Sequence, residues 1–238
     1  MSKLTEILAK IRRKWMKMRL QPIRVFCFHQ VSDTFDESTM KECDWLQADA
    51  FKRIINDMRQ KGYNFISLPE AHEKIKRDVF RSKKYVVLTA DDGWASLKNI
   101  LPWLNEQQIP ISLFLNPGYF DGIHFREKET EKYLTEDEVK HLHEQFPLIT
   151  IGLHGWEHMD ATKQTDEEFK ESIEQSVQYL SKLPNYIPYF AYTWGKHTEV
   201  NDSVLLKNNI TPVLIMGGKN YNKSKFIDRE LLNDDIKY

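Results

Sequence analysis

The stretch VVLTADDGWAS, from Val86 to Ser96, begins as a strand of apolar and β-branched residues and ends in two adjacent carboxylates and a glycine. Like charges that lie this close repel each other, and neither carboxylate is cheap to bury. Either Asp91 and Asp92 are solvated in a turn, or a nearby site needs two carboxylates in different roles. Gly93 follows them, where a residue without a Cβ lets the backbone bend sharply.

Similar apolar runs recur along the 238-residue chain and alternate with helix-like segments. The runs span 23–29, 63–67, 85–90, 111–116, 148–154, 189–194 and 211–217; the helix-like segments lie near 48–61, 69–77, 95–108, 135–145, 165–183 and 199–208. This alternation predicts an α/β fold with a parallel sheet, and continuously apolar strands predict a sheet covered on both faces. Seven such units fit a barrel with about one strand fewer than the standard eight-stranded barrel. An open doubly wound sheet is the alternative.

Two helix starts carry a capping box, Thr135 with Glu138 and Thr165 with Glu168. The segment 117–134 is long for a connection between a strand and a helix, and we expect it to form part of a site wall.

Charge is distributed unevenly. The net charge of −1 indicates no nucleic-acid partner, yet residues 1–20 carry seven Lys or Arg against one Glu, a local charge of +6. Apolar residues recur there at helical spacing, so we expect a basic amphipathic helix over 1–20 and a catalytic barrel over 21–238. Such a helix either packs on the barrel or lies on an anionic membrane surface.

The N-terminal stretch lacks a secretory signal pattern, and no apolar run approaches the length of a membrane span. The chain has two cysteines, Cys27 and Cys43. These features predict a cytoplasmic protein, with peripheral contact at the inner membrane face as an option.

Polar residues gather where the predicted strands end. His29 ends the first strand, Asp91 and Asp92 end the third, and His154 ends the fifth, with His158 four residues later. Parallel strands bring these ends to one face. Two histidines and a carboxylate form a common facial metal set that leaves positions open for water and substrate. A divalent ion there would offset the repulsion between the aspartates, whereas the alternative is a solvated turn and a chance histidine pair.

These segments resemble the motifs of the polysaccharide deacetylases, the NodB-homology or carbohydrate esterase 4 family. The matching segments, which fall within roughly 23–229, are VFCFHQVSD (25–33), LTADDGWAS (88–96), YLTEDEVKHL (133–142), IGLHGWEHMD (151–160) and FAYTWGKHTEV (190–200). The resemblance implies the family's distorted (β/α)7 barrel. It also implies metal-dependent removal of an N-acetyl group, or in some members an O-acetyl group, from a sugar or glycan intermediate.

The resemblance also implies residue roles. Asp91 is expected to be the general base. Asp92, His154 and His158 are expected to bind a divalent metal, zinc in many members, with Co²⁺, Ni²⁺ or Mn²⁺ as alternatives. Trp194 aligns with the tyrosine whose backbone N–H stabilises the oxyanion.

This sequence departs from the family pattern at several positions. The usual arginine that braces the base aligns with Ala191, the following proline with Thr193, and no histidine follows His197 to serve as the late general acid. We expect Arg229 to supply the missing positive charge and His29 to act as the acid. Core packing is the competing expectation for His29.

Several aromatic residues near these motifs have the chemistry to stack on a sugar ring: Trp94, Trp156, Tyr119 and Tyr192. Core packing is the expected fate of at least half of them. Because of the departures, a catalytically impaired relative that binds carbohydrate or a partner enzyme is an alternative function. A third is hydrolysis of a non-sugar amide on the same scaffold.

Overall fold

The computed structural model describes residue 6 and residues 21–34, 45–77, 83–120, 133–221, 224–233 and 236. The expected helix over 1–20, apart from Glu6, lies outside the described residues, as do Cys43 and most of the segment 117–134. Within the described part, no helix is long and apolar enough to cross a membrane.

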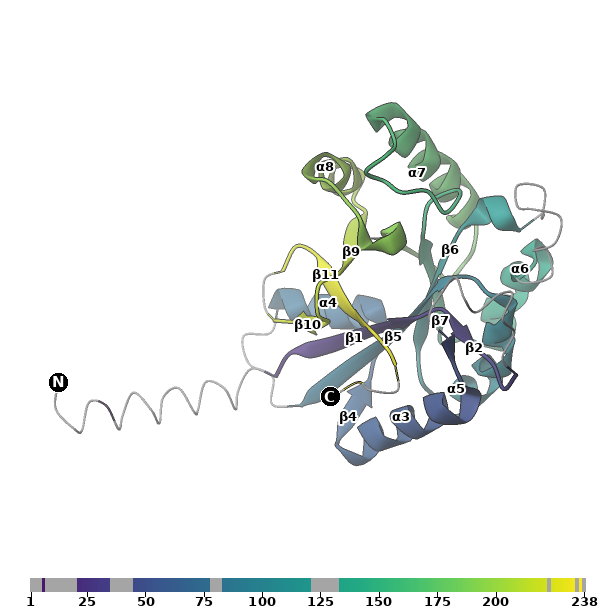
Figure 1. Ribbon diagram of the computed structural model, residues 1–238, viewed down its shortest axis with the longest axis vertical. Helices are drawn as coiled ribbons and strands as arrows, with labels where there is room; N and C mark the ends of the chain where they lie inside the picture. Colours follow the sequence, from purple (N-terminus) through teal and green to yellow (C-terminus); the bar gives the residue numbers. More distant parts are fainter. Residues whose placement is uncertain are drawn as a thin grey trace.

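Seven parallel strands close into a barrel at the centre of the molecule (Figure 1). In their order around the barrel they are β1 (Ile23–Phe28), β11 (Ile227–Leu231), β9 (Thr211–Ile215), β8 (Tyr186–Ala191), β7 (Ile149–Leu153), β6 (Ile111–Leu115) and β5 (Lys84–Asp92). The pairing of β1 with β5, from Ile23 opposite Tyr85 to Phe28 opposite Ala90, closes the ring. The predicted (β/α)7 barrel is therefore confirmed, and the open doubly wound sheet is excluded.

The seven barrel strands are not the seven apolar runs of the sequence. The run 63–67 does form strand β4 (Tyr63–Phe65), but β4 pairs with β5 outside the ring. Its place in the ring is taken by β11, whose sequence IDREL contains three charged residues. Short strands complete the sheets: β10 (Lys219–Asn220) runs antiparallel to β1, and β2 (Gln30–Val31) pairs with β3 (Trp45–Leu46).

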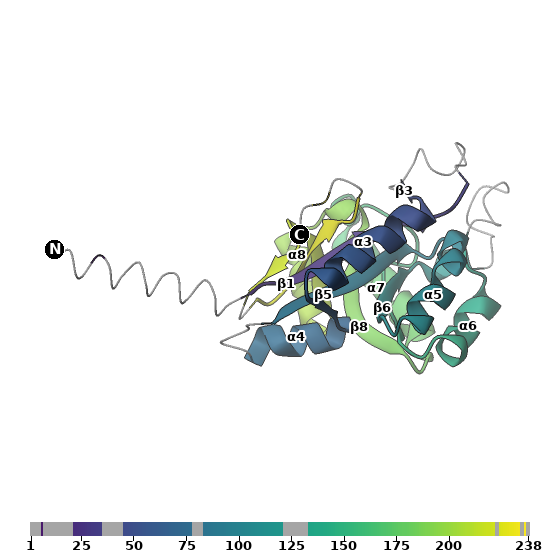
Figure 2. The same cartoon turned by 90° about the horizontal axis from the view of Figure 1, so that it is seen from below.

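The helices surround the barrel, as Figures 1 and 2 show. They are α3 (Ala48–Gln60), α4 (Leu68–Arg77), α5 (Leu101–Glu106), α6 (Glu136–Gln145), α7 (Asp166–Leu180) and α8 (Glu199–Lys207), with 3₁₀ turns η1 (Ala95–Asn99), η2 (Pro117–Tyr119) and η4 (Thr193–Gly195). Both predicted capping boxes are present. A third begins α8, where Asn201 rather than Glu or Gln completes it.

Alternation along the strands produces two cores. Residues such as Phe26 and Leu88 face outward and pack beneath the helices. Residues such as Ile23 and Val87 belong to a second cluster inside the barrel, together with Leu68 and other residues of α4. Because these α4 residues pack with residues that begin β1 and β11, α4 covers the amino-terminal end of the barrel. The carboxyl end is left for a site.

Candidate metal centre and active site

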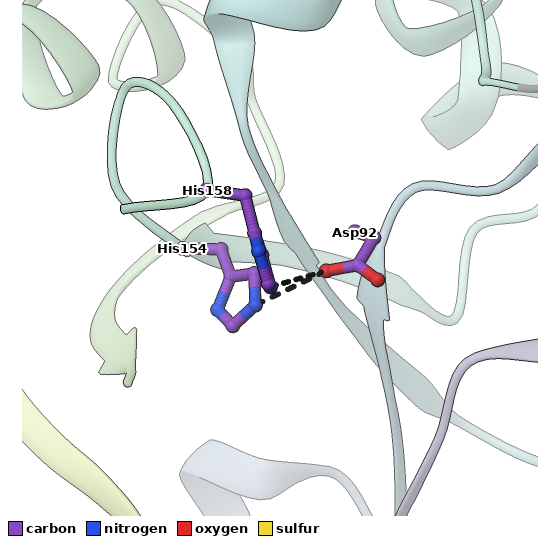
Figure 3. Close-up of side chains that lie close together, drawn as sticks. All are labelled: Asp92, His154 and His158. Atoms are coloured by element: carbon purple, nitrogen blue, oxygen red, sulfur yellow. Dashed lines mark ion pairs between the residues drawn. The ribbon is translucent and has the colours of Figure 1, made fainter. Parts of the chain in front are cut away.

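Three polar side chains converge at the carboxyl end of the barrel. Asp92 is the last residue of β5, His154 directly follows β7, and His158 lies in the loop beyond it. Oδ1 of Asp92 lies 3.2 Å from Nε2 of His154 and 3.4 Å from Nε2 of His158 (Figure 3). One ligand atom from each residue lies within 4.8 Å of the other two. The fold thus brings together the three predicted ligands.

The backbone at the end of β5 leaves strand geometry. Asp92 has φ of 69° and Gly93 has φ of 79°, a left-handed region that residues other than glycine seldom adopt. A Cβ at Gly93 would lie 2.8 Å from Cδ2 of Leu115, so a larger residue would also force the end of that side chain to shift. Adjacent residues of a regular strand point to opposite faces, and this turn is the local departure that lets neighbouring carboxylates serve one site.

The donor set fits a divalent cation. Nδ1 of His154 lies 2.7 Å from the carbonyl oxygen of Ala191, an acceptor that requires the proton on Nδ1. In the neutral ring the lone pair of Nε2 therefore faces Asp92. Among the described residues, Oδ1 of Asp92 is buried and accepts no hydrogen bond of ordinary geometry. Two imidazoles and one carboxylate are ligands that zinc prefers.

Charge and burial act against each other in this centre. Burial alone would raise the pKa of Asp92, but the close approach of His154 and the charges of His29 and His158 lower it. Burial lowers the pKa of His158 to about 4, so this ring is neutral at neutral pH, the state that a metal ligand requires. Burial also opposes a charge on His154, but Asp91 and Asp92 outweigh it and raise the pKa of His154.

Asp91 is held separately, inside the barrel, by Arg229 of β11. Nη1 of Arg229 donates to Oδ1 of Asp91 at 2.6 Å and Nη2 donates to Oδ2 at 2.8 Å. Nη1 also donates to Oγ1 of Thr89 at 3.0 Å, and the guanidinium lies 5.2 Å from the centre of the Phe114 ring. Burial would raise the pKa of Asp91, but Arg229 lowers it and so favours the ionised carboxylate.

The predicted contact between Arg229 and Asp91 is therefore present. Arg229 is fully buried, with a relative exposure of 0%. Ala191, the last residue of β8, carries no charge, and the cation that contacts Asp91 comes from β11 instead.

His29 and Trp194 lie beside the centre. His29 is partly buried between β1 and β2, close enough for its charge to act on Asp91, Asp92 and His158. Trp194 is 60% exposed, and the centre of its ring lies 4.6 Å from that of His158, edge to face. Its φ of 53° is a strained value for tryptophan, of a kind that clusters at functional sites.

Three of the four aromatic candidates for stacking on a sugar are buried, in line with the expectation that at least half of them pack in the core. Tyr192 is 1% exposed, its hydroxyl donates to Oδ1 of Asp202 at 2.9 Å, and its ring stacks on His197. It therefore packs behind β8 and offers no ring face to substrate. Tyr119 and Trp94 are also buried, and the indole N–H of Trp94 donates to Oδ2 of Asp92 at 2.9 Å.

Sequence reasoning missed an ion pair that joins the two loops of the site. Asp160 lies in the loop after β7 and Lys196 in the loop after β8. Oδ2 of Asp160 is 3.1 Å from Nζ of Lys196. Hydrogen bonds from Thr162 and the charge of Lys196 lower the pKa of Asp160 to about 2. The hydroxyl of Thr193 adds a hydrogen bond to the carbonyl of Met159. Contacts between residues this far apart in sequence leave no local signal.

Comparison with proteins of known structure agrees with this fold. The chain is similar to IcaB from Ammonifex degensii (21% identity over 90% of this chain and 93% of that one, TM-score 0.76). It is also similar to the Streptococcus pyogenes deacetylase PplD in complex with acetate (19% identity over 91% of this chain and 94% of that one, TM-score 0.76). A third similar structure is a de-N-acetylase from Aggregatibacter actinomycetemcomitans (18% identity over 92% of this chain and 97% of that one, TM-score 0.72).

Among curated protein sequences, none matches the chain significantly. The sequence profile described as polysaccharide deacetylase matches residues 78–213, which is more than half of the chain and includes both metal motifs. The chain belongs to the polysaccharide deacetylase family.

Proposed function

We propose that this protein is a metal-dependent hydrolase that removes an N-acetyl group from a sugar or glycan intermediate, with an O-acetyl group as the alternative bond. The observation that carries the proposal is the division of labour between adjacent aspartates. Asp92 faces two imidazole nitrogens, while Asp91 is held 2.6 and 2.8 Å from the nitrogens of Arg229. One carboxylate is thus placed to bind a cation and its neighbour to accept a proton.

A divalent ion bound to Asp92, His154 and His158 would lower the pKa of water and polarise the acetyl carbonyl. Zn²⁺ suits two nitrogens and one oxygen best, with Co²⁺, Ni²⁺ and Mn²⁺ as alternatives. Asp91 takes a proton from the attacking water. Arg229 orients both oxygens of Asp91 and keeps the carboxylate ionised, so that it is a competent base at neutral pH.

The remaining residues complete the hydrolysis. As the water oxygen bonds to the acetyl carbon, negative charge develops on the carbonyl oxygen, and the backbone N–H of Trp194 is proposed to donate to it. The bond between carbon and nitrogen then breaks, acetate leaves, and His29 delivers a proton to the departing amine. The exposed ring of Trp194 borders the centre, where a sugar would lie during this reaction.

Acetate release tests the proposal. The full chain, loaded with Zn²⁺, is assayed against N-acetylated sugars, O-acetylated sugars, nucleotide sugars and non-sugar amides. We expect turnover of at least one acetylated sugar and a loss of about 10²–10⁴-fold in Asp91→Asn, the usual contribution of a general base. Metal content measured in parallel should be unchanged in that variant.

Asp202→Asn is the matched control, because Asp202 is also a buried aspartate but binds Tyr192 away from the metal centre. It should retain activity. Full activity in Asp91→Asn would remove its role as base. Consistent silence of the loaded protein on every substrate would favour the alternative of a carbohydrate-binding or partner-binding relative, and turnover of non-sugar amides alone would favour the other hydrolase.

A further inference from the structure

The second oxygen of the ligand carboxylate has a partner of its own. Oδ1 of Asp92 faces the two histidines, and Oδ2 accepts the 2.9 Å hydrogen bond from the indole N–H of Trp94. Trp94 lies only two residues further along the chain, and it is 8% exposed. A buried indole N–H needs an acceptor, and here that acceptor is an oxygen of a candidate metal ligand.

The indole also begins a line of aromatic rings that returns to the metal centre. The ring of Trp94 stacks on that of Tyr133, with centres 4.6 Å apart and planes at 29°. Tyr133 packs against Tyr119 at 5.1 Å. The hydroxyl of Tyr119 accepts the backbone N–H of His158 at 2.7 Å. The line therefore joins two of the three candidate ligands, Asp92 through its side chain and His158 through its backbone.

Backbone contacts fix the segment that carries Tyr133. Trp94 and Tyr133 form an isolated antiparallel bridge, and the N–H of Leu134 donates to the carbonyl of Gly93 at 2.8 Å. Gly93 is the glycine at the left-handed turn that follows Asp92. The end of β5, which carries the ligand carboxylate, is thus bound to the segment that precedes α6 both by backbone and by ring stacking.

We propose that Trp94, Tyr133 and Tyr119 form an aromatic clamp that orients Asp92 and His158 before the ion binds, with Trp94 as its principal positioning residue. This inference rests on the proposed metal centre. Because the indole N–H occupies Oδ2, the carboxylate would offer Oδ1 as its ligand atom to a cation. Because the hydroxyl of Tyr119 holds the backbone of His158, the loop carrying that ring is fixed relative to Asp92. Partners that orient metal ligands in this way typically contribute about 10–100-fold to metal affinity.

Metal affinity of the full chain is the direct test. After removal of bound metal, Zn²⁺ is titrated against a competing chelator into the wild type, Trp94→Phe and Trp103→Phe. Phenylalanine keeps an aromatic ring at position 94 but cannot donate to Asp92. We expect Trp94→Phe to bind Zn²⁺ about 10–100-fold more weakly. Trp103 on α5 packs edge to face on Phe51 in the outer core and contacts none of the three candidate ligands, so Trp103→Phe should bind as the wild type does.

Two further readouts separate positioning from packing. The thermal midpoint of the metal-free protein reports packing, and we expect Trp94→Phe and Trp103→Phe to lower it to a similar extent. The visible absorption spectrum of the Co²⁺-loaded protein reports ligand geometry, and we expect a change in Trp94→Phe alone. Tyr119→Phe removes a single oxygen from the other end of the clamp and should also weaken Zn²⁺ binding.

The outcomes distinguish the clamp from the proposed function. Equal Zn²⁺ affinity and an unchanged Co²⁺ spectrum in Trp94→Phe, with the wild type binding Zn²⁺, would overturn the clamp and leave the function standing. If the wild type binds no metal, the proposed function fails and the clamp fails with it. If Trp94→Phe does not fold, Tyr119→Phe decides: wild-type affinity in that variant overturns the clamp.

Discussion

Replacing Arg229 by Met would leave the carboxylate of Asp91 inside the barrel without its cation. Arg229 is 0% exposed and Asp91 is 2% exposed, so water cannot take the place of the two charged hydrogen bonds. Removing one partner of a buried pair typically costs about 3–5 kcal/mol. This is a large part of the roughly 5–15 kcal/mol by which a domain is stable. Asp91→Asn should have a similar cost, because it leaves a buried guanidinium unpaired.

The double variant Asp91→Asn/Arg229→Met removes both charges at once. Its cost should be well below the sum of the two single costs, because neither charge is left without a partner. We therefore expect a coupling energy of about 3 kcal/mol or more between the two positions. Urea unfolding of the metal-free protein at pH 7 measures the three free energies of unfolding against the wild type.

Arg24→Met is the matched control. Arg24 also pairs with a carboxylate, Glu230, but that side chain is 32% exposed, so solvent can compensate. We expect Arg24→Met to lower the free energy of unfolding by less than Arg229→Met does. If Arg229→Met does not fold, Arg229→Lys keeps the charge and loses the two-pronged geometry, and it should still be less stable than the wild type. Additive effects of Asp91→Asn and Arg229→Met, within about 0.5 kcal/mol, would refute the reasoning.

Three further predictions concern other parts of the molecule. Burial and the charge of Lys76 lower the pKa of His72 to about 4, below its unfolded value of about 6.5. Between these values the unfolded chain binds more protons, so the free energy of unfolding should fall as pH drops from 6.5 to 4. In urea titrations His72→Asn should flatten this dependence of stability on pH, and an unchanged dependence would exclude His72 as its source. A Cβ at Gly152 would lie 2.6 Å from Cε1 of Phe114, so Gly152→Ala should lower the free energy of unfolding by about 1–3 kcal/mol, and an unchanged urea midpoint would contradict the packing described. If residues 1–20 contact anionic lipid at the inner membrane face, their deletion should abolish co-sedimentation with anionic vesicles at low salt, and absence of binding by the full chain would end that proposal.

Apolar periodicity predicted most of the barrel, because six of its strands have mostly apolar sequences that are largely buried. It missed β11 for a physical reason. In IDREL the inward-facing Arg229 is a buried charge, and it is tolerated only because Asp91 neutralises it. Hydrophobicity cannot identify a strand whose interior residue is charged, although the resemblance to the family did indicate that a positive charge was missing near Asp91.

The ligand set could be predicted because parallel strands bring their carboxyl ends to one end of the barrel, which places Asp92 and His154 at the same end although β6 lies between their strands. The contacts around it could not. The hydrogen bond from Trp94 depends on the left-handed backbone at Asp92, and a sequence that reads as a regular strand up to that residue does not reveal it. The burial of Tyr192 depends on α7 and α8 packing over β8, which involves residues distant in sequence.

A crystal structure of the full chain grown with ample Zn²⁺, with the ion identified by its anomalous scattering, tests the central claim most directly. We expect one ion bound by Oδ1 of Asp92 and by Nε2 of both His154 and His158, with Asp91 unligated and still paired with Arg229. An ion coordinated by Asp91, or no ion between these three side chains, would contradict the account.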